Sequence, residues 1–146
     1  MKRRAIFVAL SGAALLVFLT AWLFVRSHQD NQQELALGAQ VYADNCASCH
    51  GANLEGEADW RVQDNEGFMP APPHDETGHT WHHSSEQLFA ITKYGIAEAA
   101  GLTNYQSRMP AFEGVLTDDQ IRSVLSYIEA QWPEDIRANR EQRLSR

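Results

Sequence analysis

One short run, Cys46-Ala47-Ser48-Cys49-His50, constrains this 146-residue chain more than any other feature. Two thiols at this spacing can add to the two vinyl groups of one haem, and the adjacent histidine can then ligate the iron. A redox dithiol or half of a zinc site would use the same two cysteines. The chain has no third cysteine, and no βαβ pattern of the kind found around thioredoxin-like dithiols follows the run. The run therefore predicts one covalent haem c on Cys46 and Cys49, with His50 as an axial ligand.

The N-terminus predicts a membrane anchor. Lys2-Arg3-Arg4 precedes 21 uncharged residues, from Ala5 to Val25. A helix of that length spans about 30 Å, the hydrocarbon thickness of a bilayer, and the basic residues before it favour a cytoplasmic N-terminus. A cleaved signal peptide is the alternative, but the run is long for one and lacks an A-x-A-like site. We expect a single-pass protein of a bacterial inner membrane, with the rest of the chain in the periplasm.

The exported part is strongly acidic. After Arg26 the chain holds 8 basic and 19 acidic residues, a formal charge of −11. This balance argues against nucleic acid as a partner and favours proteins with basic docking surfaces. For a haem protein, such partners would be an electron donor and an electron acceptor.

Composition divides the chain into four segments: a cytoplasmic tip and transmembrane anchor (1–26), a polar linker (27–33), a haem domain (34–133) and a charged C-terminal tail (134–146) that we expect to be solvated or frayed. Helices are predicted before the haem run and after Ser84 and Thr117, which begin sequences that resemble capping boxes. Gly95 is expected to end the middle helix. Residues 51–83 show no periodicity and predict a long loop over the haem. A tight helix crossing would explain Gly38, which lies inside the first of these helices.

A methionine is the expected second axial ligand of the haem iron. Met69 and Met109 are both followed by proline, so the dipeptide does not separate them. Met109 lies in a loop between two predicted helices, which can carry its sulfur to the opposite haem face. We expect Met109 to be the sixth iron ligand, and Met69 to fill space at the haem edge.

Taken together, these features resemble a mono-haem class I c-type cytochrome with an N-terminal membrane anchor, and the resemblance covers roughly Leu35 to Trp132. It is carried by the haem run with Gly51, by Ala71-Pro72-Pro73, by Arg108-Met109-Pro110-Ala111-Phe112, and by Val124-Leu125-Ser126-Tyr127-Ile128 in the last helix. The resemblance implies a small all-α fold of three to four helices, after one transmembrane helix, with the first and last helices crossing near Gly38 and Tyr127. It also implies that a carbonyl of Pro72 or Pro73 holds the ring of His50, and that His50 and Met109 ligate the iron. The implied role is that of an electron carrier rather than an enzyme.

Four histidines fall within one ten-residue segment: His74, His79, His82 and His83. Imidazole suits copper or zinc, so a second metal site is conceivable. Two alternative functions follow. One is a haem sensor or peroxidase-like protein with a labile sixth ligand, and the other is a copper-binding accessory subunit that uses this segment.

Overall fold

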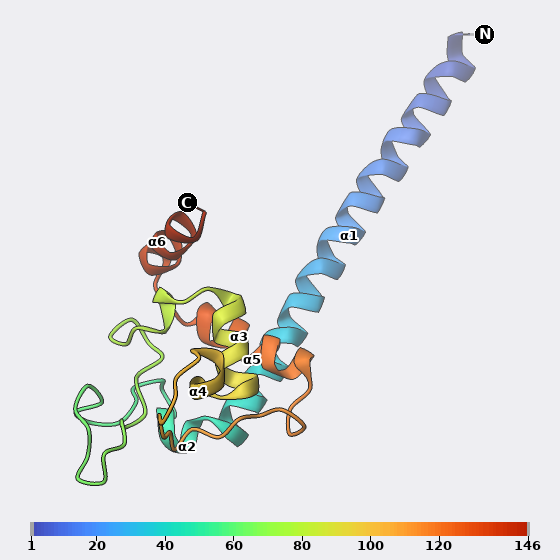
Figure 1. Cartoon of the computed structure of the whole chain (residues 1–146). Coiled ribbons are helices and arrows are strands. Elements are labelled where there is room, and N and C mark those ends of the chain that lie inside the picture. The colour runs from blue at the N-terminus through green and yellow to red at the C-terminus, as the bar shows by residue number, and fades with distance from the viewer. Residues whose placement is uncertain (1, 146) are drawn as a thin grey trace. The chain divides into compact units, whose positions relative to one another are not determined.

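The computed structural model describes residues 2–145, and their side chains from Leu15 onward. Figure 1 shows an architecture of helices joined by long loops, and the described residues contain no strand, which confirms the all-α prediction. In chain order the elements are α1 (Lys2–Asn45), α2 (Ala47–His50), the 3-10 helix η1 (Thr80–His82), α3 (Ser85–Tyr94), α4 (Ile96–Ala99), α5 (Asp118–Ala130) and α6 (Glu134–Leu144).

The chain forms two compact units, residues 1–33 and 34–146. The first unit is the N-terminal part of α1. Its apolar side chains from Leu15 to Val25 are exposed, but no helix among the described residues is long and apolar enough to cross a membrane. The predicted anchor, residues 5–25, lies partly outside the described side chains. Residues 27–33, predicted as a linker, are helical, because this polar stretch contains no glycine or proline to interrupt α1.

The core of the second unit lies where the end of α1 meets α5. Val41, Tyr42, Val124 and Ile128 are buried there, together with Leu54 and Trp132. At Gly38 the two helices touch through their backbones, since a Cβ at this position would stand 2.0 Å from the carbonyl oxygen of Ser123 and 2.7 Å from Cβ of Tyr127. The predicted crossing is therefore present, and it requires glycine on α1.

Capping sets the ends of α3 and α5. Thr117 and Gln120 form a reciprocal capping box at the start of α5. Ser84 caps α3 by accepting the backbone N–H of Gln87 at 3.2 Å. Helix α3 ends at Gly95, whose φ of +85° is unfavourable for residues with a side chain. These three boundaries agree with the sequence predictions.

The C-terminal segment differs from its prediction. Residues 134–146 were expected to be solvated or frayed, but Glu134–Leu144 forms α6, and Arg140 on this helix is only 5% exposed. Its guanidinium pairs with Glu129 at 3.3 Å and donates to the hydroxyl of Ser85 at 3.0 Å. A long arginine stem can cover apolar surface while its head remains paired, so a charged sequence can still dock.

Candidate haem-binding site

A single helical turn presents the haem run. Cys46 precedes α2, and its carbonyl accepts the backbone N–H groups of Cys49 at 3.1 Å and of His50 at 2.9 Å. Both cysteines are free thiols; Cys46 is half-buried and Cys49 is exposed. Burial raises the pKa of the Cys46 thiol to about 11. The turn therefore offers two unpaired thiols and a histidine within one short element, as covalent haem attachment needs.

The ring of His50 is fixed by the proline segment. His50 is 7% exposed, and its Nδ1 lies 2.8 Å from the carbonyl oxygen of Pro72. Because that carbonyl can only accept, Nδ1 carries the proton and Nε2 keeps a free lone pair. Burial lowers the pKa of His50, although the Pro72 contact opposes this effect. The result is an oriented, neutral imidazole, which is the form that binds iron.

The resemblance left open whether the carbonyl of Pro72 or that of Pro73 accepts this hydrogen bond, and the structure distinguishes them. Pro72 contacts His50, whereas the Pro73 carbonyl accepts a long bond of 3.4 Å from the hydroxyl of Thr80. Gly56 brings this segment close to the haem run. Its φ is +67°, and a Cβ there would lie 2.5 Å from the nitrogen of Pro73. The backbone of Gly56 also donates to the His50 carbonyl at 2.8 Å, so this glycine joins the two segments.

His74 has a role that the sequence did not indicate. Its ring stacks on the ring of His50, with centroids 4.0 Å apart and planes inclined by 22°. Its Nδ1 lies 2.8 Å from the hydroxyl of Thr80, and its carbonyl accepts the indole N–H of Trp132 at 2.7 Å. Burial lowers the pKa of His74 to about 3. His74 is thus a neutral ring packed on the proposed iron ligand; its position two residues after Pro72 was the available signal.

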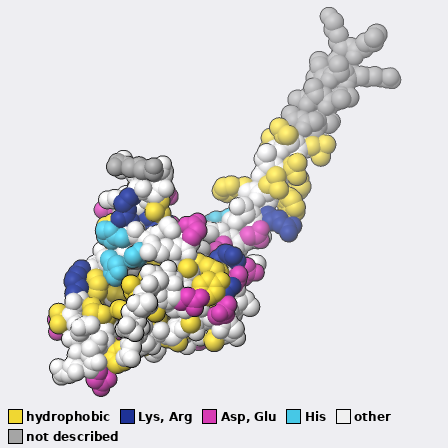
Figure 2. All heavy atoms as spheres, in the orientation of Figure 1, with side chains coloured by type: hydrophobic (Ala, Val, Ile, Leu, Met, Phe, Trp, Pro, Cys, Tyr) yellow, Lys and Arg dark blue, Asp and Glu magenta, His cyan; other side chains and the backbone are white. Residues whose placement is uncertain are grey.

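The other histidines of that segment lie near the surface, where Figure 2 shows histidine side chains gathered on one face. His79 stacks on Trp60 with centroids 5.3 Å apart, and it meets His83 edge-on at the same distance. His82 lies 2.7 Å from a guanidinium nitrogen of Arg143. Within residues 15–145, no group of three His, Cys, Asp or Glu side chains is placed to hold a metal ion. The arrangement therefore gives the conceivable second metal site no support.

Met109 is half-buried in the loop between α4 and α5, and Met69 is half-buried in the long loop before η1. The backbone N–H of Met109 donates to the hydroxyl of Ser107 at 3.0 Å. Beyond Met109, the N–H of Phe112 donates to the carbonyl of Thr92 at 3.1 Å, which ties the loop to α3. The structure thus assembles Cys46, Cys49, His50 and Pro72 in one place. Ligation by Met109 remains a prediction.

The donor set fits a haem. The two thiols are unpaired, Nε2 of His50 is available, and apolar residues of the core lie directly around the run, since Cys46 and Ala47 pack against the buried cluster. The indole Nε1 of Trp81 is buried and has no partner among the described residues. An acceptor such as a haem propionate would satisfy that N–H group.

An all-α fold with this Cys-x-x-Cys-His turn and a buried, oriented imidazole defines a haem protein of the c type. Residues 35–132 match the cytochrome c family, and the chain belongs to that family. It accordingly carries one covalent haem c, and its family supports haem-mediated electron transfer.

The chain is similar to several curated cytochromes. It is 31% identical to cytochrome c6 of Thermosynechococcus vestitus, over 88% of this chain and 91% of that protein. It is 33% identical to cytochrome c6 of Nostoc sp., over 65% of this chain and 72% of that protein. It is 25% identical to the cbb3-type cytochrome c oxidase subunit FixP of Sinorhizobium medicae, over 71% of this chain but only 32% of FixP. No solved structure matches the chain.

Proposed function

We propose that this protein is a membrane-tethered periplasmic electron carrier whose haem iron is held between His50 and Met109. The haem, held by Cys46, Cys49, His50 and Met109, would supply one-electron redox chemistry between a reduced protein and an oxidised one. The observation that carries the proposal is the fixed ring of His50, buried, neutral and held by Pro72. A rigid ligand set means that few atoms move when the iron changes its oxidation state.

The chain's own residues supply attachment, orientation and insulation. Cys46 and Cys49 would tether the haem, so that it stays bound when the iron changes charge. Pro72 and His74 restrain the imidazole of His50 from its edge and from its face. Ligation by histidine and methionine raises the reduction potential relative to two nitrogen ligands. This arrangement suits transfer of an electron between proteins rather than chemistry on a substrate at the iron.

The matched variants Met109→Ala and Met69→Ala test this function. The ferric wild-type protein is expected to show the methionine-to-iron charge-transfer absorption, and Met109→Ala is expected to lose it. Met69→Ala should retain it, because Met69 occupies a different loop. A high-spin ferric haem in the wild type at neutral pH would contradict the proposal and favour the sensor or peroxidase-like alternative, which needs a labile sixth site.

The membrane tether is supported by Lys2-Arg3-Arg4 and the uncharged run of residues 5–25. In a bacterial host that attaches haem c, the full chain is expected in the membrane fraction, with its haem domain sensitive to protease added to spheroplasts. A full-length variant with two arginines in the middle of the run should leave that fraction. Full-length protein that is released by breaking the cells without detergent would refute the tether.

Redox partners with basic surfaces would suit the charge of −11 that follows Arg26. Electrostatic steering of such partners weakens as salt rises. Electron transfer to a basic acceptor protein should therefore slow with increasing ionic strength, whereas transfer to an acidic acceptor should become faster. Rates that do not depend on salt would argue against docking through the acidic surface.

A further inference from the structure

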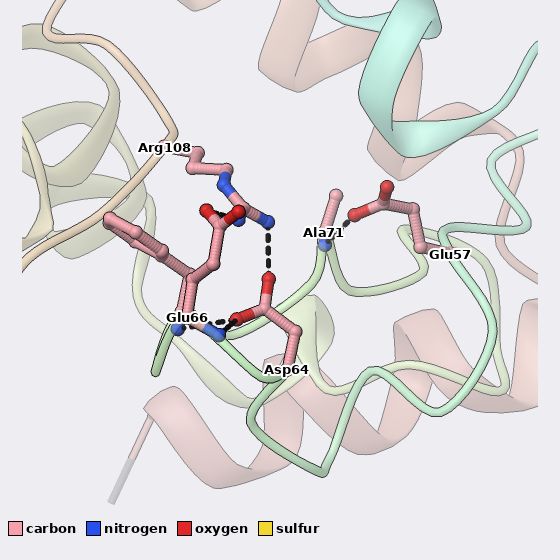
Figure 3. Close-up of polar contacts among 6 residues, drawn as sticks. Glu57, Asp64, Glu66, Ala71 and Arg108 are labelled. Atoms are coloured by element: carbon pink, nitrogen blue, oxygen red, sulfur yellow. Dashed lines mark hydrogen bonds and ion pairs between the residues drawn. The ribbon is translucent and has the colours of Figure 1, made fainter.

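Arg108, which directly precedes Met109, reaches a distant segment of the chain. Its guanidinium pairs with Asp64 and, at 2.8 Å, with Glu66, which lie 44 and 42 residues earlier in the sequence. It also stands over the ring of Phe68, 4.5 Å from the centroid. Figure 3 shows the guanidinium pointing toward both carboxylates from the opposite loop. Arg108 thus connects the loop that carries Met109 to the loop that precedes Ala71-Pro72-Pro73.

The segment that receives Arg108 is itself ordered. The Asp64 carboxylate accepts the backbone N–H groups of Glu66 at 2.9 Å and of Phe68 at 3.0 Å. The Asp64 N–H donates to the Phe68 carbonyl at 2.9 Å, which closes the turn. These backbone bonds, followed by Arg108, lower the pKa of Asp64 and keep it ionised. Arg108 therefore binds a turn whose shape is already fixed, which we call the Asp64–Phe68 turn.

A few residues connect this turn to the ring of His50. Ala71 donates its N–H to the Glu57 carboxylate at 2.6 Å and accepts the Glu57 N–H at 2.8 Å, a contact that Figure 3 also shows. The next residue, Pro72, supplies the carbonyl that holds His50. The turn that Arg108 binds is thus followed closely in the chain by Pro72, which orients the ring of His50.

We propose that Arg108 is a positioning residue that ties the Met109 loop to the Asp64–Phe68 turn, and thereby restrains both axial ligands through one segment. The inference rests on the proposed ligation by Met109. Single exposed ion pairs contribute little, but here two carboxylates and an aromatic face act on one guanidinium that is joined by a peptide bond to the ligand. We call these contacts of Arg108 with Asp64, Glu66 and Phe68 the clamp. Without the clamp, Met109 is expected to dissociate from the iron more often.

Imidazole added to the full-length ferric protein tests the proposal, because it binds the iron only when Met109 has left. Its apparent affinity reports the fraction of protein with an open sixth position. Arg108→Ala is expected to raise that affinity roughly tenfold, from two exposed ion pairs and one cation–π contact. Arg122→Ala is the matched control, since Arg122 is also exposed, pairs with Asp119 at 3.3 Å and lies over Phe89 at 5.0 Å, but sits on α5.

A second variant separates the clamp from a simple field effect. Arg108→Ala removes a positive charge and Glu66→Gln removes a negative one, so a field effect would move imidazole affinity in opposite directions. Loss of the clamp raises it in both, and Glu66, whose side chain is 71% exposed, can be replaced without threatening the fold.

The possible outcomes distinguish the two proposals. If the wild type shows methionine ligation but Arg108→Ala and Glu66→Gln match Arg122→Ala in imidazole affinity, the clamp is refuted and the electron-carrier function stands. If the wild type lacks methionine ligation, the proposed function fails and the clamp fails with it. Equal losses of unfolding midpoint in Arg108→Ala and Arg122→Ala, with imidazole affinity raised in Arg108→Ala and Glu66→Gln but not in Arg122→Ala, support the positioning role.

Discussion

Replacing Gly38 with alanine should destabilise the second unit, although alanine is the better helix former. In an open helix the change would gain about 1 kcal/mol. Here the new Cβ would stand 2.0 Å from the Ser123 carbonyl oxygen, where ordinary contact begins at 3.4 Å. The obstacle is backbone rather than a flexible side chain, so α1 and α5 must separate by about 1.4 Å at the crossing.

The size of the expected loss in unfolding free energy follows from the residues packed between α1 and α5. Val41, Tyr42, Val124 and Ile128 are each at most 4% exposed, so separation opens the best-packed part of the core. Overpacking a core costs about 1–3 kcal/mol, occasionally more, and a backbone obstacle places Gly38 at the upper end. After the gain in helix propensity, we expect a net loss of about 2 kcal/mol, or a fall in Tm of about 8 °C for a domain of this size.

Thermal and urea unfolding of the haem-loaded protein would measure this loss. Ala36→Gly is the matched control, because Ala36 is exposed on the same helix and reports propensity alone, at about 0.5–1 kcal/mol. A Gly38→Ala variant as stable as the wild type, or more stable, would refute the reasoning, since it would mean that the crossing accommodates a side chain.

Two further predictions concern the proline segment and the last helix. Gly56→Ala should shift the reduction potential and haem spectrum by pushing Pro72 off His50, whereas Gly101→Ala should not; both glycines have positive φ, but of the two only Gly56 has backbone within 4 Å of the added Cβ. Equal reduction potentials in the two variants would show that backbone strain at a positive φ, and not displacement of Pro72, causes the shift. Arg140→Ala should release α6 from the domain and lower the free energy of unfolding by about 2 kcal/mol, because it leaves the half-buried Glu129 without its buried partner. Amide exchange across α6 should rise in that variant and stay unchanged in Arg137→Ala, which removes an exposed arginine; equal exchange in both variants would contradict the docking.

The parts of this fold that sequence could predict are those set by local chemistry. The box at Thr117, the cap at Ser84 and the helix end at Gly95 each depend on residues within one turn of one another. The haem run is equally local, since its chemistry lies in five consecutive residues. Gly38 was predictable for another reason: a glycine inside a helix is costly unless something must approach closely.

The parts that escaped prediction depend on partners far away in the chain. His74 could be recognised as part of a histidine-rich segment, but its stacking on His50 requires Pro72 to bring the segment back over the haem run. Likewise, the burial of Arg140 depends on Glu129 and on Ser85, 55 residues earlier. Composition describes the charge of such residues and does not show which surfaces they meet.

Tyr42 connects the stability of the helix crossing to the geometry of the haem site. It lies one turn after Gly38 on α1, is 2% exposed, and donates its hydroxyl to the carbonyl of Gly51 at 2.8 Å, with the His50 carbonyl at 3.3 Å. Burial raises its pKa, so the hydroxyl remains a donor. The helix crossing determines how deeply Tyr42 is buried. Through its hydroxyl contacts, Tyr42 in turn sets the position of the end of the haem run and of the His50 backbone. A disturbance at Gly38 should therefore reach the iron ligand through Tyr42, and the close contact between α1 and α5 is part of how the chain positions its haem.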